Sequence, residues 1–366
     1  PIDQVQEQKL NEMMERLTTD EMDIAARASY EYLLLEQQSL SKLTQQQTIT
    51  YAKQLALRFL KAKMGNVDKA LLRLKETLVF RREQDLDTLR LCLNDPSTLQ
   101  QGGEEVDEEK ETESSDEEDS DDEEEGGDDE EEEENGDAAN ETKKENIDEE
   151  ETDAPRNHLY AKKCAQMRME LTEQLRFKSV YVHGFDQEGR STYIFIPRKV
   201  QSHDPDWTLK QHLYTLERAI ACSRAPDRTV NAIVDFAGFS MANHAPPTAI
   251  GQQFMVTFRN HYAGAVHRIF VLNAPTSFWC LWSLFKPLVA IQTRAKIIFV
   301  NTPLPNIGPI HNNKDILHDH YDPDQINESM MEGGLARDFS VNEYLYKTPF
   351  DRAFDDVRRD ESENLL

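Results

Sequence analysis

Ser240 is the side chain whose neighbours come nearest to those of a hydrolytic nucleophile. It lies in the sequence GFSMA at 238–242, which partly matches the G-x-S-x-G turn of α/β-hydrolases. The second glycine is absent, and residues 243–247 separate this turn from the next predicted helix, whereas a nucleophile turn opens directly into one. We therefore interpret Ser240 as a loop hydroxyl or part of a pocket rim, and we predict that the protein is not an enzyme.

The histidines and cysteines show no spacing that is typical of a metal site. His244, His261 and His267 have no repeated interval, and the four cysteines lie far apart. The sequence also has no P-loop and no dinucleotide-binding fingerprint. We predict no metal, no cofactor and no nucleic-acid partner, and reduced thiols in a cytoplasmic protein.

Residues 267–301 combine two apolar strands with a very apolar helix, a pattern that indicates lipid uptake. Strands 268–272 and 296–300 are near-continuous apolar runs, as expected for strands buried on both faces of a mostly parallel sheet. The helix 277–289 is apolar on more than one face, so one side can fill a core while another contacts a membrane. The side chains that we expect at the membrane are Phe278, Trp279, Trp282, Phe285 and Leu288.

The charge of the chain is concentrated in one acidic segment. Residues 104–153 hold 31 acidic side chains and three lysines, a net of −28, which equals the net charge of the whole chain. The remainder is balanced, with 69 − 31 = 38 acidic and 41 − 3 = 38 basic residues. Repelling charges with almost no apolar content cannot offset the entropy of ordering, so we predict a disordered insert in an otherwise neutral protein.

Alternating strand and helix patterns predict an α/β fold. Strands at 193–197, 230–236, 268–272 and 296–300 alternate with helices at 209–223, 248–262 and 277–289. The predicted organisation is a polar helical extension at 1–48, a helical module at 49–96, the acidic insert at 102–155, the α/β domain at 158–346 and a charged tail at 347–366. No run reaches the ~20 apolar residues of a membrane span. Because the chain begins at Pro1 without Met, we expect a residue or segment upstream.

Within the helical module, the pattern indicates two amphipathic helices separated at Gly65–Asn66, with Asp68 as the expected N-cap of the second. Residues 1–48 have a weaker helical period and are Gln-rich, so we expect loosely packed helices there.

Seven motifs occur in one order along the chain. They are LALRFLKAKMGNVDKALLRLKETLVFRRE at 55–83, DQEGRSTYIF at 186–195, LERAIACSRA at 216–225, VDFAGFS at 234–240, HRIFVLNAP at 267–275, LFKPLV at 284–289 and TRAKIIFV at 293–300. In this order and spacing they resemble the CRAL-TRIO lipid-binding family, the phosphatidylinositol/phosphatidylcholine and tocopherol transfer proteins. The resemblance implies a mixed, mostly parallel sheet that floors an apolar pocket, closed by a mobile gate helix within 277–289.

The resemblance also implies residues that bind a lipid headgroup. Thr293 and Lys296 match the Thr and Lys that contact the inositol phosphate in phosphatidylinositol-binding members. Lys63 matches the first member of a basic pair in the helical module, whereas the second falls on Met64. The glutamate that grips the inositol hydroxyls is replaced by Gly264.

Phosphatidylcholine contacts are largely absent at the matching positions. Two tyrosines and a Ser/Thr pair correspond to Val182, Tyr193, Val230 and Ala232, and only Tyr193 is retained. The sequence thus favours a monomeric carrier that moves a phospholipid, with phosphatidylinositol as the leading ligand, between membranes to which it binds peripherally. A carrier of a sterol, tocopherol or isoprenoid remains the alternative, as does a lipid-docked scaffold.

The acidic insert offers two further hypotheses. Ser114, Ser115 and Ser120 each have an acidic residue three positions on, which is the pattern that acidophilic kinases favour. The insert could recruit basic protein partners, or it could compete with anionic membrane for the basic side chains of the helical module. Those side chains are Arg58, Lys61, Lys63, Arg81 and Arg82.

Overall fold

We describe a computed structural model of the 366-residue chain. It describes residues 3–30, 32, 43–92, 154–201, 204–300, 314–334 and 339–347. The acidic insert (except for its last two residues), Ser114, Ser115, Ser120 and the tail beyond residue 347 lie outside these residues. The hypotheses on phosphorylation and on basic partners therefore stay predictions.

A five-stranded sheet forms the centre of the α/β domain. Its strands lie in the order β1 to β5: Val180–Phe185, Ser191–Phe195, Val230–Asp235, Val266–Leu272 and Ile297–Val300. The β1–β2 pair is antiparallel and the other three pairs are parallel. The prediction of a mostly parallel sheet is confirmed, although β1 was not among the predicted strands.

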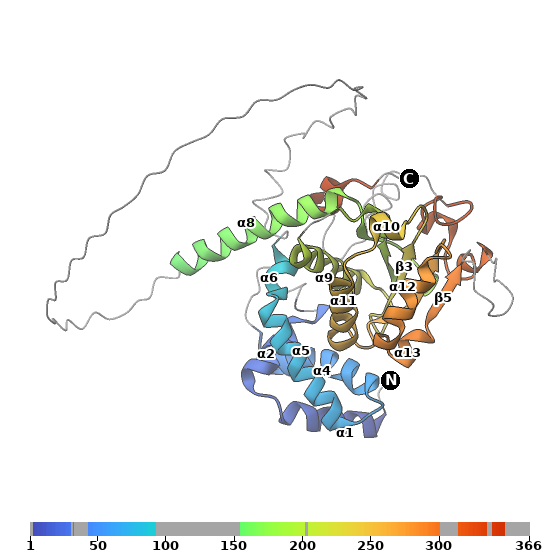
Figure 1. Cartoon of the computed structure of the whole chain (residues 1–366). Coiled ribbons are helices and arrows are strands. Elements are labelled where there is room, and N and C mark those ends of the chain that lie inside the picture. The colour runs from blue at the N-terminus through green and yellow to red at the C-terminus, as the bar shows by residue number, and fades with distance from the viewer. Residues whose placement is uncertain are drawn as a thin grey trace, which may run out of the picture.

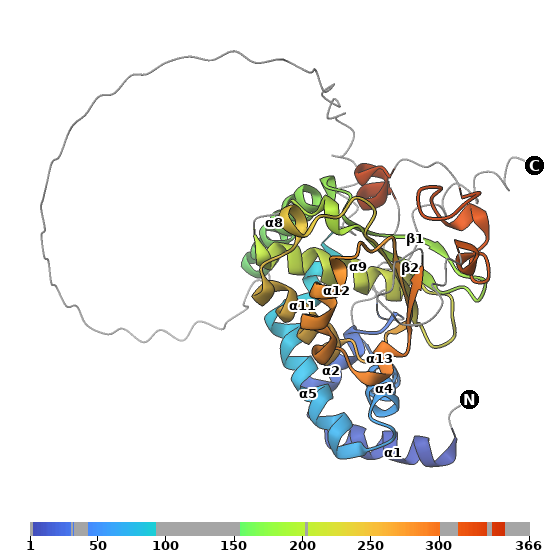
Figure 2. The same cartoon turned by 45° about the vertical axis from the view of Figure 1, so that its right-hand side comes forward.

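Helices connect the parallel strands, because a crossover must return the chain to the same end of the sheet. The helix α9 (Pro205–Cys222) joins β2 to β3, and the short α10 (Met241–His244) is followed by α11 (Thr248–His261) before β4. The helix α12 (Phe278–Phe285) and the one-turn α13 (Ile291–Arg294) precede β5. Figures 1 and 2 show α9, α11 and α12 lying against the sheet. The predicted helix 277–289 is thus broken into α12 and a 3₁₀ turn at Lys286–Leu288, where Pro287 cannot donate a backbone hydrogen bond.

The N-terminal residues form a bundle of helices beneath this domain (Figures 1 and 2). They are α1 (Gln4–Glu15), α2 (Thr19–Arg27), α4 (Gln45–Ala62), α5 (Val67–Glu83) and α6 (Leu86–Leu91). We call α4 to α6 the helical module. The first two helices pack more tightly than we expected, because Met13 and Ala25 are fully buried in one apolar cluster with Phe59 and Leu74 of the module.

The break between α4 and α5 occurs at the predicted place, but a different residue caps the second helix. The Asn66 side chain accepts a hydrogen bond from the Lys69 amide at 2.9 Å, so Asn66 is the N-cap. Asp68 lies one position inside the helix, in its first turn.

The helix α8 (Ala154–Arg176) leads into β1, and the C-terminal residues pack back over the same region. Tyr344 is fully buried, its hydroxyl accepts a hydrogen bond from the Val182 amide at 3.1 Å, and the Arg218 guanidinium lies 3.8 Å from its ring centre. Phe339 packs against Tyr181, with ring centroids 4.5 Å apart. The apolar strip at 339–345 therefore belongs to the core of the α/β domain. Among the described helices, none is both long and apolar enough to cross a membrane.

Candidate functional site

A cavity of about 2050 Å³ lies between the sheet, the helices α9, α11 and α12, and the helical module. Strands β2 to β5 supply its floor through Phe195, Ala232, Val234, Ile269 and Ile297. The side walls are also mostly apolar. Their apolar residues include Leu57, Leu216, Ile250, Phe254, Phe258, Phe278, Leu281, Trp282 and Phe285. Such a cavity can enclose a large apolar ligand.

The lining of the cavity carries positive charge. Nine basic side chains and one acidic side chain, Asp227, line the cavity. The basic residues are Arg58, Lys61, Lys63, Lys69, Arg73, Arg224, Arg228, Arg259 and Lys296. Arg73 pairs with Glu76 at 2.7 Å, and Arg259 donates to the Leu288 carbonyl at 3.2 Å. Four of the nine, Arg58, Lys61, Lys63 and Lys69, have side chains without a hydrogen bond or ion pair inside the described ranges.

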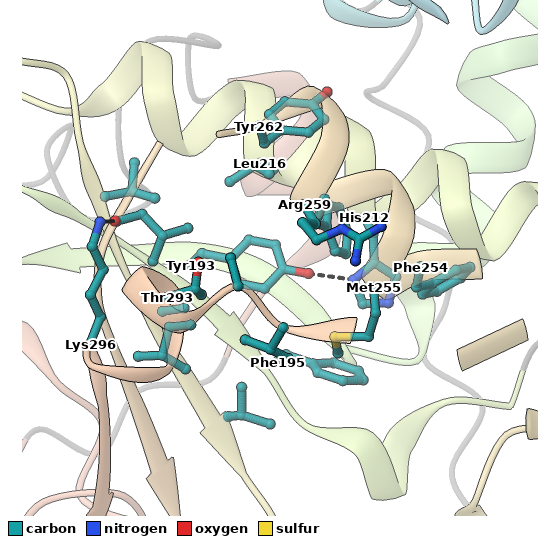
Figure 3. Close-up of a pocket in the computed structure, with 18 of the residues that line it drawn as sticks. Tyr193, Phe195, His212, Leu216, Phe254, Met255, Arg259, Tyr262, Thr293 and Lys296 are labelled. Atoms are coloured by element: carbon teal, nitrogen blue, oxygen red, sulfur yellow. Dashed lines mark hydrogen bonds between the residues drawn. The ribbon is translucent and has the colours of Figure 1, made fainter. Parts of the chain in front are cut away.

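Thr293 and Lys296 both line this cavity, so the structure brings the two predicted headgroup residues to one wall (Figure 3). Thr293 lies on α13, and Lys296 lies directly before β5. The Lys296 ammonium donates to the Val266 carbonyl at 2.5 Å. Partial burial lowers the pKa of Lys296, and Asp227 opposes that effect. An ammonium held at a cavity wall in this way can add a charge-assisted hydrogen bond to an anionic ligand.

Tyr193 also lines the cavity, but it is bound to another protein side chain. Its hydroxyl forms a hydrogen bond with Nδ1 of His212 on α9 (Figure 3). Both side chains are buried, with 9% and 3% of their surfaces exposed. Burial raises the pKa of Tyr193 and lowers that of His212 to about 3, so both are neutral near pH 7. The sequence offered no signal for His212, because its position within a buried helix resembles that of any core residue.

All five predicted membrane-contacting residues are buried or half-buried in this structure. Phe278 and Phe285 are buried and line the cavity. Trp279 and Trp282 are half-buried, and their rings lie 5.1 and 6.1 Å from that of Phe299.

Leu288 is half-buried in the turn after α12, whereas two apolar residues that we did not select reach solvent. Leu284 is 51% exposed and Ile291 is 72% exposed. The side chains of Leu284 and Ile291 are thus exposed to a larger fraction than any of the five residues predicted to contact the membrane.

Comparisons with known proteins identify the domain. The model of the CRAL/TRIO domain matches residues 175–331, which include the sheet and α9, α11 and α12. The chain contains a CRAL/TRIO domain. The resemblance is therefore confirmed for the six motifs between residues 186 and 300, whereas the motif at 55–83 lies outside the matched residues.

Curated relatives include transfer proteins from a plant and a yeast. The chain is 30% identical over 138 residues to the phosphatidylinositol/phosphatidylcholine transfer protein SFH11 of Arabidopsis thaliana, covering 33% of this chain and 37% of that protein. It is 32% identical over 146 residues to SFH13 of the same plant, covering 35% and 23% of the two chains. The phosphatidylinositol transfer protein PDR17 of Saccharomyces cerevisiae is 22% identical over 179 residues, covering 48% and 46%. This chain thus matches less than half the length of each of these relatives.

A solved structure of Sfh5 is also similar, with a TM-score of 0.31 and 13% identity, covering 40% of this chain and 61% of that one.

Lys63 extends the positive charge of the CRAL/TRIO cavity onto the helical module. It is the C-cap residue of α4 and lines the cavity. Burial lowers its pKa, and the nearby guanidiniums of Arg73 and Arg259 lower it further. The next residue, Met64, which occupies the second position of the basic pair, is 84% exposed. Lys63 is therefore in a group of like charges that an anion would stabilise.

Gly264 has a backbone conformation that suits glycine. Its φ is +75°, in the turn after α11, where the Ala265 amide donates to the Tyr262 carbonyl. An added Cβ would lie 3.4 Å from Cγ of Arg58, which belongs to α4. The positive φ and the close approach of the helical module both favour glycine at this position over a residue with a side chain, such as glutamate.

Ser240 and His244 do not form a nucleophile and base in this structure. The Ser240 backbone amide, rather than its hydroxyl, donates to Nδ1 of His244 at 2.9 Å. Both residues belong to α10 and its N-cap, a single helical turn. Across the described ranges, no group of three or more His, Cys, Asp or Glu side chains could hold a metal ion.

Proposed function

We propose that this protein binds a phospholipid, with phosphatidylinositol as the leading ligand, and moves it between membranes or presents it at a membrane. The proposal rests on one observation: a single cavity has mostly apolar walls, and its lining includes nine basic side chains but only one acidic side chain. A phospholipid has the same division into apolar chains and an anionic headgroup. The names of the transfer-protein relatives support the same ligand class.

The apolar part of the cavity would enclose the acyl chains. Each methylene removed from water contributes about 0.8 kcal/mol, so two chains supply a large driving force once the cavity has closed over them. The strand floor and the aromatic residues Phe254, Phe258 and Phe278 offer the dry surface that this transfer needs.

The phosphate would bind at the wall formed by Thr293 and Lys296. A hydroxyl and an ammonium from one turn of chain can each donate to a phosphate oxygen. Gly264 supplies no carboxylate for inositol hydroxyls, so we infer that recognition of the phosphate contributes more than recognition of the ring.

Lipid exchange requires the cavity mouth to approach a bilayer. Exposed apolar residues occur on the elements that enclose the cavity: Met64 after α4, Met255 on α11, Leu284 on α12 and Ile291 on α13. The cavity lining also includes nine basic residues. Apolar side chains that insert at the interface, combined with cations that attract anionic lipid, are the usual basis of peripheral binding.

A transfer assay between two vesicle populations tests this function. Donor vesicles would contain fluorescent phosphatidylinositol, and acceptor vesicles would lack it. We expect the protein to increase the transfer rate and to retain phosphatidylinositol through purification, as seen by native mass spectrometry. Lys296→Ala should reduce transfer about tenfold, because a charge-assisted hydrogen bond contributes about 1.5–3 kcal/mol.

The matched control is Lys162→Ala, which removes an exposed lysine of α8 that is not part of the cavity lining. This variant should transfer at the wild-type rate. Transfer by the wild-type protein no faster than spontaneous exchange would contradict the proposed function. Equal losses in both lysine variants would contradict the role of Lys296.

A further inference from the structure

The Tyr193–His212 pair is a polar site in the apolar part of the cavity. Tyr193 comes from β2 and His212 from α9, so the pair joins the floor of the cavity to one wall. In Figure 3 the Tyr193 ring points away from Lys296 and toward His212, so the pair and the cationic wall lie on different sides of the cavity. A ligand could therefore contact both.

The surroundings of His212 are aromatic. The rings of Phe195, Phe254 and Phe258 have centroids 4.9, 5.2 and 6.3 Å from that of His212, mostly edge to face. These residues come from β2 and α11, and each also lines the cavity. Burial lowers the pKa of His212, so the imidazole is neutral near pH 7. The pair therefore offers a ligand uncharged hydrogen-bonding groups, whereas Lys296 offers a positive charge.

The Tyr193–His212 pair keeps hydrogen-bonding groups that its own hydrogen bond does not use. If the Tyr193 hydroxyl donates to Nδ1 of His212, then Nε2–H remains as a donor and the Tyr193 oxygen as an acceptor. If Nδ1–H donates instead, Nε2 remains as an acceptor and the Tyr193 hydroxyl as a donor. Either tautomer leaves one donor and one acceptor.

The remaining hydrogen-bonding capacity of His212 is directed to the cavity. Among the described residues, the His212 side chain has no hydrogen bond other than that with Tyr193. Its Nε2 is also not one of the fully enclosed polar atoms that lack a partner. An atom that is neither enclosed nor bonded, in a residue that lines the cavity, keeps access to that cavity.

We propose that the Tyr193–His212 pair binds one uncharged oxygen, a hydroxyl or a carbonyl, carried within the apolar part of the ligand. This inference rests on the proposed lipid-binding function and specifies part of its ligand. A wholly hydrocarbon chain would remove water from the pair without replacing its hydrogen bonds, whereas an oxygen at this position would restore them. The pair thus selects among lipids by a group in the tail region, independently of the headgroup.

Competition between two matched probes tests the inference. The full chain would be incubated with vesicles that contain equal amounts of oleyl alcohol and cis-9-octadecene, which differ only by the hydroxyl, and bound probes would be extracted and quantified. Flexible single chains are chosen because they can enter any apolar cavity. Relative to their ratio in the vesicles, we expect the wild-type protein to enrich the alcohol about tenfold, a difference of about 1.4 kcal/mol.

The decisive variant is Tyr193→Phe/His212→Phe, which removes both polar groups and so leaves no stranded partner. It should lose the enrichment while still taking up both probes. Lys162→Ala is the control, because this exposed lysine of α8 is not part of the cavity lining and its loss should keep the enrichment. A separate arm measures phosphatidylinositol transfer by the same proteins.

The outcomes separate the two proposals. Phosphatidylinositol transfer by the wild type without enrichment of the alcohol overturns the inference and leaves the proposed function intact. Enrichment that persists in the double variant also overturns it. Failure to take up either probe or phosphatidylinositol overturns both proposals.

Discussion

The Arg81 guanidinium on α5 donates to the Glu217 carboxylate on α9 at 2.8 Å, and each side chain is only 5% exposed. Arg90 of α6 lies 3.2 Å from the same carboxylate, and the Tyr262 hydroxyl after α11 donates to it at 2.9 Å. One buried anion thus joins the helical module to the CRAL/TRIO domain beside the cavity. Arg81 is therefore not available to the acidic insert, contrary to the hypothesis that included it.

Glu217→Gln should destabilise the protein by about 3–5 kcal/mol. Removing the carboxylate of a buried ion cluster leaves Arg90 without its paired anion and Arg81 with only the more distant Asp87, at 3.8 Å. The free energy of unfolding from urea titration measures this loss. Glu173→Gln is the control, because its pair with Arg176 is exposed on both sides and should contribute less than about 1 kcal/mol. Equal effects of the two substitutions would contradict the importance of the buried cluster.

Stability should fall as the pH is lowered from about 6.5. Burial lowers the pKa of His212 to about 3, and burial together with Arg73 lowers that of His261 to about 4. The unfolded state, with histidine pKa values near 6.5, therefore takes up protons first, and this part of the stability is lost between about pH 6.5 and 3.

Glu217 contributes to the same trend at lower pH. Although burial alone would raise its pKa, Arg81 and Arg90 lower it to about 2 from an unfolded value of about 4.5. Its contribution is present above about pH 4.5 and is lost as the pH falls toward 2.

Urea midpoints at pH 7, 6, 5 and 4 would show the combined trend, and His212→Phe should reduce the slope of the midpoint with pH between pH 6.5 and 4.5. A wild-type midpoint that does not change over this range would show the prediction to be wrong.

Gly251→Ala should loosen the contact between α11 and α12. A Cβ at position 251 would lie 2.5 Å from Cζ of Phe285, so the ring must move. Overpacking of this kind costs about 1–3 kcal/mol, part of which is relieved if α12 shifts outward. Because α12 forms one wall of the cavity, we expect fluorescent phosphatidylinositol to leave the protein up to about tenfold faster in a stopped-flow exchange measurement.

The double variant Gly251→Ala/Phe285→Leu is the matched control for this prediction. A leucine is smaller than the phenylalanine ring, so the exchange rate should return toward that of Phe285→Leu alone. An exchange rate in Gly251→Ala equal to that of the wild type would mean that α12 does not move as lipid leaves.

Gly264→Glu should not improve phosphatidylinositol binding, although it restores the residue type that the family resemblance implies. A non-glycine residue at φ +75° is strained by about 1–3 kcal/mol, and its Cβ would contact Arg58. We expect a lower melting temperature in calorimetry and no increase in transfer rate. Gly264→Asn is the control, because asparagine tolerates this backbone region better and should lose less stability. Faster transfer by Gly264→Glu would show that the turn can adapt.

Much of the fold could be predicted from the sequence, because each element carries its own periodic signal. The apolar runs 230–236, 268–272 and 296–300 correspond to β3, β4 and β5, and helical periods marked α9 and α11. The strand β1 was not predicted, because it includes His183 and Gly184 and has no clear alternation: all six of its residues are buried. A local pattern cannot show that C-terminal residues, such as Phe339 and Tyr344, pack against this strand.

The residues of the candidate site could be predicted only where they belong to the seven motifs of the family resemblance. Thr293 and Lys296 do line one cavity wall, and Lys63 is also part of the cavity lining. The exposed positions of Leu284 and Ile291 were not predictable, because an all-round apolar helix does not show which face will be covered. The packing of α12 against Phe299 and α11 determines which of its side chains are covered and which are exposed.

Most elements, the α/β class, the lipid-binding resemblance and the concentration of negative charge in residues 104–153 can be predicted from the amino-acid sequence. These follow from composition and short-range spacing. By contrast, the hydrogen bond between His212 and Tyr193, the joining of three helical elements by Glu217 and the contact of Gly264 with Arg58 arise only from packing in three dimensions. Each of these contacts joins residues that are far apart in the chain or on different elements. Their proximity depends on how the helical module and the sheet pack together, which no local pattern encodes.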